Sequence, residues 1–141
     1  MRIIRTVIAG LLASLLGVGV IAAAPVQADQ ALPKRTIAEE PPGDHQINFN
    51  TFKLKGTVTE LQVDGVTYLP YEDKKVHLQK KACAKKSCKW KTVKKVKTNE
   101  LGKYKTKIFA PRDGRWKWRV KVNASNGFGT TKGEIWTLFF S

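Results

Sequence analysis

The stretch Arg115-Trp116-Lys117-Trp118-Arg119-Val120-Lys121-Val122 decides the fold class that this sequence predicts. Basic and apolar side chains alternate through all eight positions, which is the two-residue period of a β-strand. A helix would scatter the four bases around its circumference, whereas a strand gathers both tryptophans and both valines on one side. We therefore predict a strand that buries its Trp and Val side in a hydrophobic core and exposes its bases to water.

Six further runs of alternating or apolar residues are separated by Gly, Pro, Asn and Asp, a punctuation typical of all-β proteins. They cover residues 49–59, 66–69, 75–81, 88–98, 103–109 and 132–140. Gly56 indicates a bulge or a close approach of another part of the chain. The apolar phase slips between residues 90 and 96, so we expect a bulge near Lys94 and Lys95. The run 132–140 is apolar on both faces, which predicts a central or covered strand.

The N-terminal part of the chain has the features of an export signal. A basic start, an apolar stretch from residue 6 to 24 and the small-residue site Val26-Gln27-Ala28 predict cleavage after Ala28. The competing interpretation is an uncleaved membrane anchor through residues 6–24, which are numerous enough to span a bilayer. In either case the rest of the chain is exported, and we expect it to be extracellular or associated with the cell wall. The predicted divisions are a signal peptide over 1–28, a flexible linker over 29–46 and one folded domain over 47–141.

Seven short strands within residues 47–141 predict an all-β fold, a two-sheet antiparallel sandwich of the immunoglobulin or fibronectin type. Four segments point to a family: V-H-L-Q-K-K at 76–81, W-K-T-V at 90–93, T-N-E-L-G-K-Y at 98–104 and W-R-V at 118–120. They resemble the immunoglobulin-like β-sandwich modules of secreted and surface proteins of Gram-positive bacteria, especially actinobacteria. The resemblance implies a spacer, an adhesive unit or a binding accessory, and no catalytic residues come with it.

Positive charge is the second strong feature of the sequence. Residues 1–28 hold two bases and no acid, so the remainder has 24 Lys and Arg against 11 Asp and Glu, a net charge of +13. Fourteen lysines and a single acid, Glu100, lie from Lys74 to Lys107, so this block alone accounts for the excess. Solubility requires a net charge of only about 2 to 8 in a small domain. The four bases of 115–122 lie outside this block. The functional hypothesis therefore concerns residues 74–107 and not the strand 115–122.

The lysine block has two interpretations. In the first, outward lysines keep the protein soluble and prevent strand edges from pairing with other chains. In the second, they merge into one positive surface that binds a polyanion. The lysines predicted to bind it are Lys80, Lys81, Lys85, Lys86, Lys89, Lys91, Lys94, Lys95, Lys97, Lys103, Lys105 and Lys107.

The composition also indicates the kind of polyanion. Only four of the 24 bases are Arg, the residue whose bidentate fork reads base edges, and this disfavours specific recognition of nucleic acid. Lysine favours attraction that does not depend on sequence. Outside a cell, the partners we expect are an anionic cell-wall polymer or a membrane surface.

The sequence offers little for catalysis. After the signal, the serines are Ser87, Ser125 and Ser141 and the histidines are His45 and His77, which do not combine into a Ser-His-acid constellation. We therefore expect a non-catalytic protein without a cofactor or a metal site. The alternatives are a cationic antimicrobial or inhibitory effector, and a small secreted hydrolase whose site the sequence does not reveal.

Cys83 and Cys88 are the two cysteines of the chain, and in an exported protein we expect them to form a disulfide. Because the loop that they close is short, the bond should stabilise the fold by only about 2 kcal/mol. The mass of the protein should increase by about two protons on reduction. A thiol assay that finds two reactive cysteines before reduction would contradict the pairing.

Overall fold

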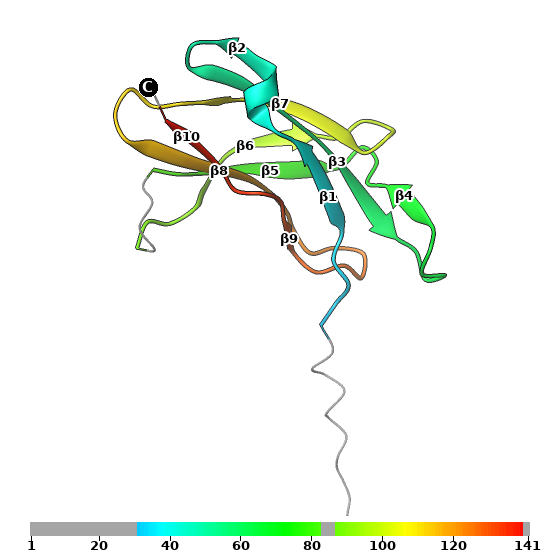
Figure 1. Cartoon of the computed structure of the whole chain (residues 1–141). Helices are drawn as coiled ribbons and strands as arrows, with labels where there is room; N and C mark the ends of the chain where they lie inside the picture. The colour runs from blue at the N-terminus through cyan, green and yellow to red at the C-terminus, as the bar shows by residue number, and fades with distance from the viewer. Residues whose placement is uncertain (1–30, 83–86, 140–141) are drawn as a thin grey trace, which may run out of the picture. The chain divides into compact units, whose positions relative to one another are not determined.

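The computed structural model describes residues 31–82 and 87–139, which form an all-β fold of two antiparallel sheets (Figure 1). These ranges contain one short 3-10 helix, η3, and no helix that is long and apolar enough to cross a membrane. The predicted signal peptide lies outside them. In chain order the elements are β1 (Thr36–Glu40), η3 (Pro42–His45), β2 (Gln46–Asn48), β3 (Thr51–Leu61), β4 (Tyr68–Pro70), β5 (Lys75–Lys81), β6 (Lys91–Lys97), β7 (Lys103–Phe109), β8 (Arg115–Val122), β9 (Thr131–Lys132) and β10 (Trp136–Phe139).

The long strand β3 is the centre of the first sheet. Along one edge it pairs with β7, from Thr51↔Phe109 to Thr57↔Lys103, and then with β4. Along the other edge it pairs with β1 and, through an irregular register, with β2. One strand of 11 residues therefore holds four partners in place.

The second sheet has the strand order β10-β8-β5-β6, and β9 pairs with the end of β8. The predicted strand 115–122 is β8, and it lies inside this sheet between β5 and β10. Its alternation is confirmed, because Trp118 and the two valines are buried while Trp116 packs against the core. The register of β5 with β6 shifts between Leu78 and Gln79, which are opposite Lys94 and Thr92, so the bulge predicted near Lys94 is also confirmed.

The hydrophobic core takes side chains from the facing sides of both sheets, which makes the fold sandwich-like. Alternate residues of β3, β5, β7 and β8 supply it, as the two-residue period requires. Its most deeply buried members are Leu54, Val58, Val76, Leu78, Ile108, Val120 and Val122.

The segment 32–46 differs from the flexible linker that the sequence predicts. It belongs to the compact unit, which begins at Leu32, and β1 pairs with β3 from Thr36↔Thr59 to Glu40↔Lys55. The physical reason is that β1 packs Ile37 against the core and uses Glu39 for hydrogen bonds to both sheets. The prolines of this segment lie on either side of β1 and therefore remove no hydrogen bond from its ladder.

The run 132–140 is not the central strand that its apolar residues predict. It is interrupted at Gly133, leaving the short β9 and, after it, β10 at the end of the sheet order. The outward Phe139 is half exposed, and its ring lies 5.1 Å from the guanidinium carbon of Arg115. Contact with a neighbouring cation thus accounts for an aromatic residue on the outer side of β10.

Glu39 of β1 and Tyr104 of β7 are both register partners of Gly56, which lies between them on β3. The Tyr104 hydroxyl donates a hydrogen bond to Glu39 Oε1 at 2.5 Å. The other carboxylate oxygen accepts from Trp136 Nε1 at 3.1 Å and from the backbone N–H of Glu134 at 2.9 Å. A Cβ on residue 56 would lie 2.6 Å from Tyr104 Cζ, so the close approach expected at Gly56 is confirmed.

Gly56→Ala should lower the free energy of unfolding by about 1–3 kcal/mol, because the added methyl group collides with Tyr104 and displaces it from Glu39. Urea unfolding followed by tryptophan fluorescence measures the change. Gly43→Ala is the control, since a Cβ there meets nothing within 4 Å and should alter stability by less than about 0.5 kcal/mol. Equal stabilities of the two variants would show that Gly56 does not make room for Tyr104.

Candidate functional site

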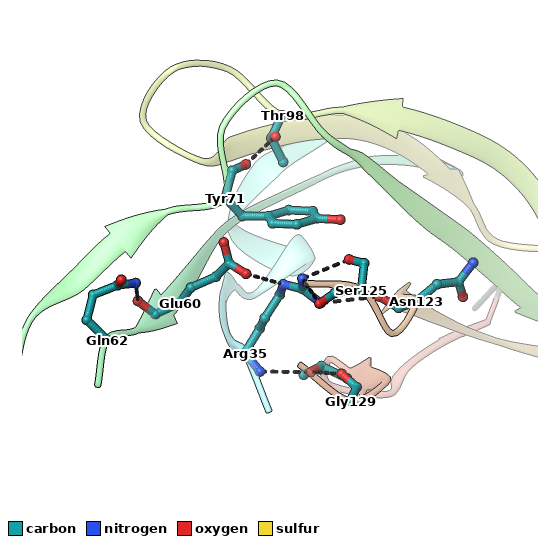
Figure 2. A network of polar contacts seen from close by, with 9 residues as sticks. Arg35, Glu60, Gln62, Tyr71, Thr98, Asn123, Ser125 and Gly129 are labelled. Atoms are coloured by element: carbon teal, nitrogen blue, oxygen red, sulfur yellow. Dashed lines mark hydrogen bonds and ion pairs between the residues drawn. The ribbon is translucent and has the colours of Figure 1, made fainter. Parts of the chain in front are cut away.

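The buried Arg35 ties the segment before β1 to the loop after β8 (Figure 2). Its Nε donates to Glu60 at 3.0 Å, and its two Nη groups donate to the carbonyl oxygens of Asn123 and Ser125 and to the Ser125 hydroxyl. The guanidinium carbon also lies 4.5 Å from the centre of the Tyr71 ring. Because every guanidinium nitrogen already has an acceptor, this network stabilises the fold and leaves Arg35 no fork for a ligand.

Other ionisable groups in the described ranges are also held in structural contacts. Burial raises the pKa of Glu39, although three hydrogen bonds to its carboxylate act in the opposite direction. His45 forms a contact of 2.5 Å with Glu40 near the surface. Residues 31–82 and 87–139 contain no group of three His, Cys, Asp or Glu side chains placed to hold a metal ion.

In the described ranges, the outward surface of the second sheet carries more bases than that of the first. Its strands contain twelve Lys and Arg residues, three in β5, four in β6, four in β8 and one in β9, and none of them, nor β10, contains an acidic residue. Antiparallel pairing places the outward side chains of neighbouring strands side by side. We define the cationic face as Lys75, His77, Gln79, Lys81, Lys95, Lys97, Arg115, Lys117, Arg119, Lys121 and Lys132.

Like charges are direct cross-strand neighbours on the cationic face. Three of the pairs are Lys75↔Lys97, Lys81↔Lys117 and Lys121↔Lys132. Such pairs destabilise a sheet. Within the described ranges, one ion pair reaches the face, from Lys97 to Asp73 at 3.4 Å, and because both side chains are well exposed it offsets little of the repulsion.

His77 lies in the middle of this charge. Its register partners are Lys95 on β6 and Lys121 on β8, and Lys75 is its neighbour on the outward side of β5. Burial, and then the charges of these three lysines, lower the pKa of His77. These effects favour the neutral imidazole, and its Nε2 lies 3.2 Å from Asn123 Nδ2.

The lysines predicted to bind a polyanion are not gathered on one surface. Three lie on the cationic face: Lys81, Lys95 and Lys97. Three lie on the outer surface of the first sheet: Lys103, Lys105 and Lys107. Lys80 turns to the core side, where its ammonium lies 3.8 Å from the Trp116 ring. Of the others, Lys91 and Lys94 are exposed on β6, Lys89 is exposed before it, and Lys85 and Lys86 lie outside the described residues.

The bases of β8 are the functional candidates that the sequence does not single out. They lie far along the chain from the lysine block, but β8 pairs with β5, so Arg119 is opposite Gln79 and Lys117 is opposite Lys81. The alternation of 115–122 already predicts that these bases point outward. The missing information is the strand order, which decides which outward side chains become neighbours.

The predicted disulfide involves one residue, Cys83, that lies outside the described residues. No cysteine within the described ranges is free. The pairing of Cys83 with Cys88 stays a prediction.

Comparisons with protein-family profiles, curated proteins and solved structures found no match for this chain. The cationic face is therefore the basis of the functional proposal.

Removing a positive charge beside His77 should raise the pKa of this residue, because the imidazolium is then repelled less. Lys95→Gln and Lys121→Gln should each do so, as measured by NMR titration of the His77 ring protons. Lys105→Gln removes the same charge from the outer surface of the first sheet and should leave the His77 pKa unchanged. A shift of equal size in all three variants would show that the field at His77 does not come from the cationic face.

Proposed function

We propose that this protein is a secreted, non-catalytic module that binds an anionic cell-surface or cell-wall polymer through the cationic face. The observation that carries the proposal is the acid-free second sheet, in which outward bases of β5, β6, β8 and β9 are neighbours. Charge of one sign on one surface attracts polyanions and gains affinity from the counterions that it releases. The export signal predicted over 1–28 would place this face outside the cell, where such polymers are found.

The spacing of the charges favours a linear polymer. Outward bases occupy every second position of β8, so positive charge recurs about every 6.6–6.8 Å along the strand. A shorter row, Lys95 and Lys97, lies on β6, and between the two rows β5 carries Lys75 and Lys81 on either side of His77 and Gln79, with neighbouring strands roughly 4.8 Å apart. An extended chain with regularly spaced anionic groups can meet these rows without changing the backbone of the sheet.

We further propose that the fold is an immunoglobulin-like sandwich. If β1, β3, β5, β6, β7, β8 and β10 are lettered A, B, C, C′, E, F and G, the pairs A–B and B–E form one sheet and C′–C, C–F and F–G form the other. Immunoglobulin sandwiches use these pairings, with C′ on the CFG sheet in the variable type. Within the described ranges, β7 has no strand D beside it, and β2, β4 and β9 are short additions.

Two triple variants test the binding proposal. Replacing Lys95, Lys117 and Lys121 with Gln should weaken binding to heparin at low salt by roughly tenfold or more and make it less dependent on salt, because three counterion-releasing contacts are lost. The control replaces Lys103, Lys105 and Lys107 with Gln, which removes the same charge from the other sheet. It should retain most of the affinity.

Salt-dependent elution from immobilised heparin, with isolated wall polymer as a second probe, gives the comparison. Equal losses in both triple variants would show that net charge alone governs binding. Elution of the unmodified protein at the salt expected of a neutral domain would reject polyanion binding altogether.

A further inference from the structure

A hydrogen-bonded row crosses three strands of the cationic face and ends at Arg119. Gln79 of β5 is buried, and its Nε2 donates to the Thr92 hydroxyl of β6 at 3.2 Å. This contact directs Gln79 Oε1 toward β8, where it accepts from Arg119 Nε at 2.9 Å. The row therefore holds the Arg119 side chain in one orientation.

Trp90 holds the same guanidinium from a second direction. The Arg119 guanidinium carbon lies 4.0 Å from the centre of the Trp90 ring, a cation–π contact. The Lys81 ammonium lies 5.9 Å from the same centre. One indole ring thus has two cations of the face beside it.

The remaining donors of Arg119 are its two Nη groups. In the described part of the chain, neither of its Nη groups donates to a protein acceptor, whereas both Nη groups of Arg35 do. Burial lowers the pKa of Arg119, but a guanidinium remains protonated at physiological pH. Arg119 therefore presents an oriented and charged pair of donors that no described residue of the protein accepts from.

The surroundings of this pair are basic. Lys117 and Lys121 flank Arg119 on the outward side of β8, and Lys81 is the register partner of Lys117 on β5. An anion that meets the Arg119 fork is thus within reach of flexible ammonium groups on both strands.

We propose that Arg119 is the anchoring position for a tetrahedral oxyanion, a phosphate or sulfate group of the bound polymer. This inference rests on the proposed function, because it names the chemical group that the cationic face recognises. A tetrahedral anion can place two oxygens on the Arg119 fork and offer a further oxygen to a neighbouring ammonium. A carboxylate has only two oxygens, and the fork uses both.

The test compares Arg119→Lys with Arg115→Lys in the mature protein. Both changes keep the charge and remove a guanidinium fork from the same strand, but within the described ranges Arg115 has a ring contact with Phe139 and no side-chain hydrogen bond. The probes are polyphosphate, dextran sulfate and polyglutamate, titrated at equal ionic strength. Urea unfolding confirms that each variant is folded.

The unmodified protein should bind polyphosphate and dextran sulfate more tightly than polyglutamate. Arg119→Lys should lose about tenfold in affinity for the two tetrahedral probes and less for polyglutamate, because a carboxylate on the fork has no further oxygen for a neighbouring ammonium, whereas Arg115→Lys should resemble the unmodified protein. Gln79→Ala, which keeps Arg119 but frees it from the row, should reproduce part of the loss. Loss with only one tetrahedral probe would identify that group, phosphate or sulfate, as the ligand.

Two results would overturn the inference in different ways. If the polymers bind but Arg119→Lys and Arg115→Lys are equivalent, or polyglutamate binds as well as the other probes, the anchor is rejected and the proposed function survives. If the unmodified protein binds none of the three polymers at low salt, the proposed function fails and the anchor fails with it.

Discussion

The carboxylate of Glu39 is the constraint on which the arrangement of the two sheets depends. Its donors are Tyr104 on β7, Trp136 on β10 and the backbone just before β10, so one side chain of β1 connects both sheets. Burying a carboxylate is costly unless its oxygens are hydrogen-bonded, and burial raises the pKa of Glu39 even with three donors. The contact requires glycine at 56, because any side chain there would occupy the space through which Tyr104 reaches across β3.

Arg35 has the corresponding role at the other end of β1. Its ion pair with Glu60 reaches β3, and its bonds to Asn123 and Ser125 reach the loop after β8 (Figure 2). A single short strand is thus fixed by a buried cation before it and a half-buried carboxylate within it, both of them hydrogen-bonded. Within the described ranges, the outward bases are more numerous on the second sheet than on the first.

The sequence predicts what depends on local alternation and misses what depends on partners. The strand 115–122 and the bulge near Lys94 follow from the phase of apolar residues, which is set within one strand. The sequence does not predict β1, because its segment has few apolar residues. The hydrogen bonds of Glu39 that hold β1 in place come from residues 65 or more positions away. The sequence does not predict the cationic face for a similar reason. Its members come from strands that are separated in the chain and become neighbours only through the order β8-β5-β6.

The position of β8 within its sheet separates the two interpretations of the positive charge. Lysines on β6 protect an exposed sheet edge from pairing with another chain, and that alone explains them. β8 has β5 on one side and β10 on the other, so it has no edge to protect, yet every outward position on it is basic. The outer surface of the first sheet also pairs like charges, at Lys53↔Lys107 and Lys55↔Lys105, but Glu40 lies beside Lys55 there, whereas the strands of the second sheet contain no acid. The like-charge pairs on the cationic face cost stability in the free protein, and under the proposed function a bound polyanion would remove their repulsion.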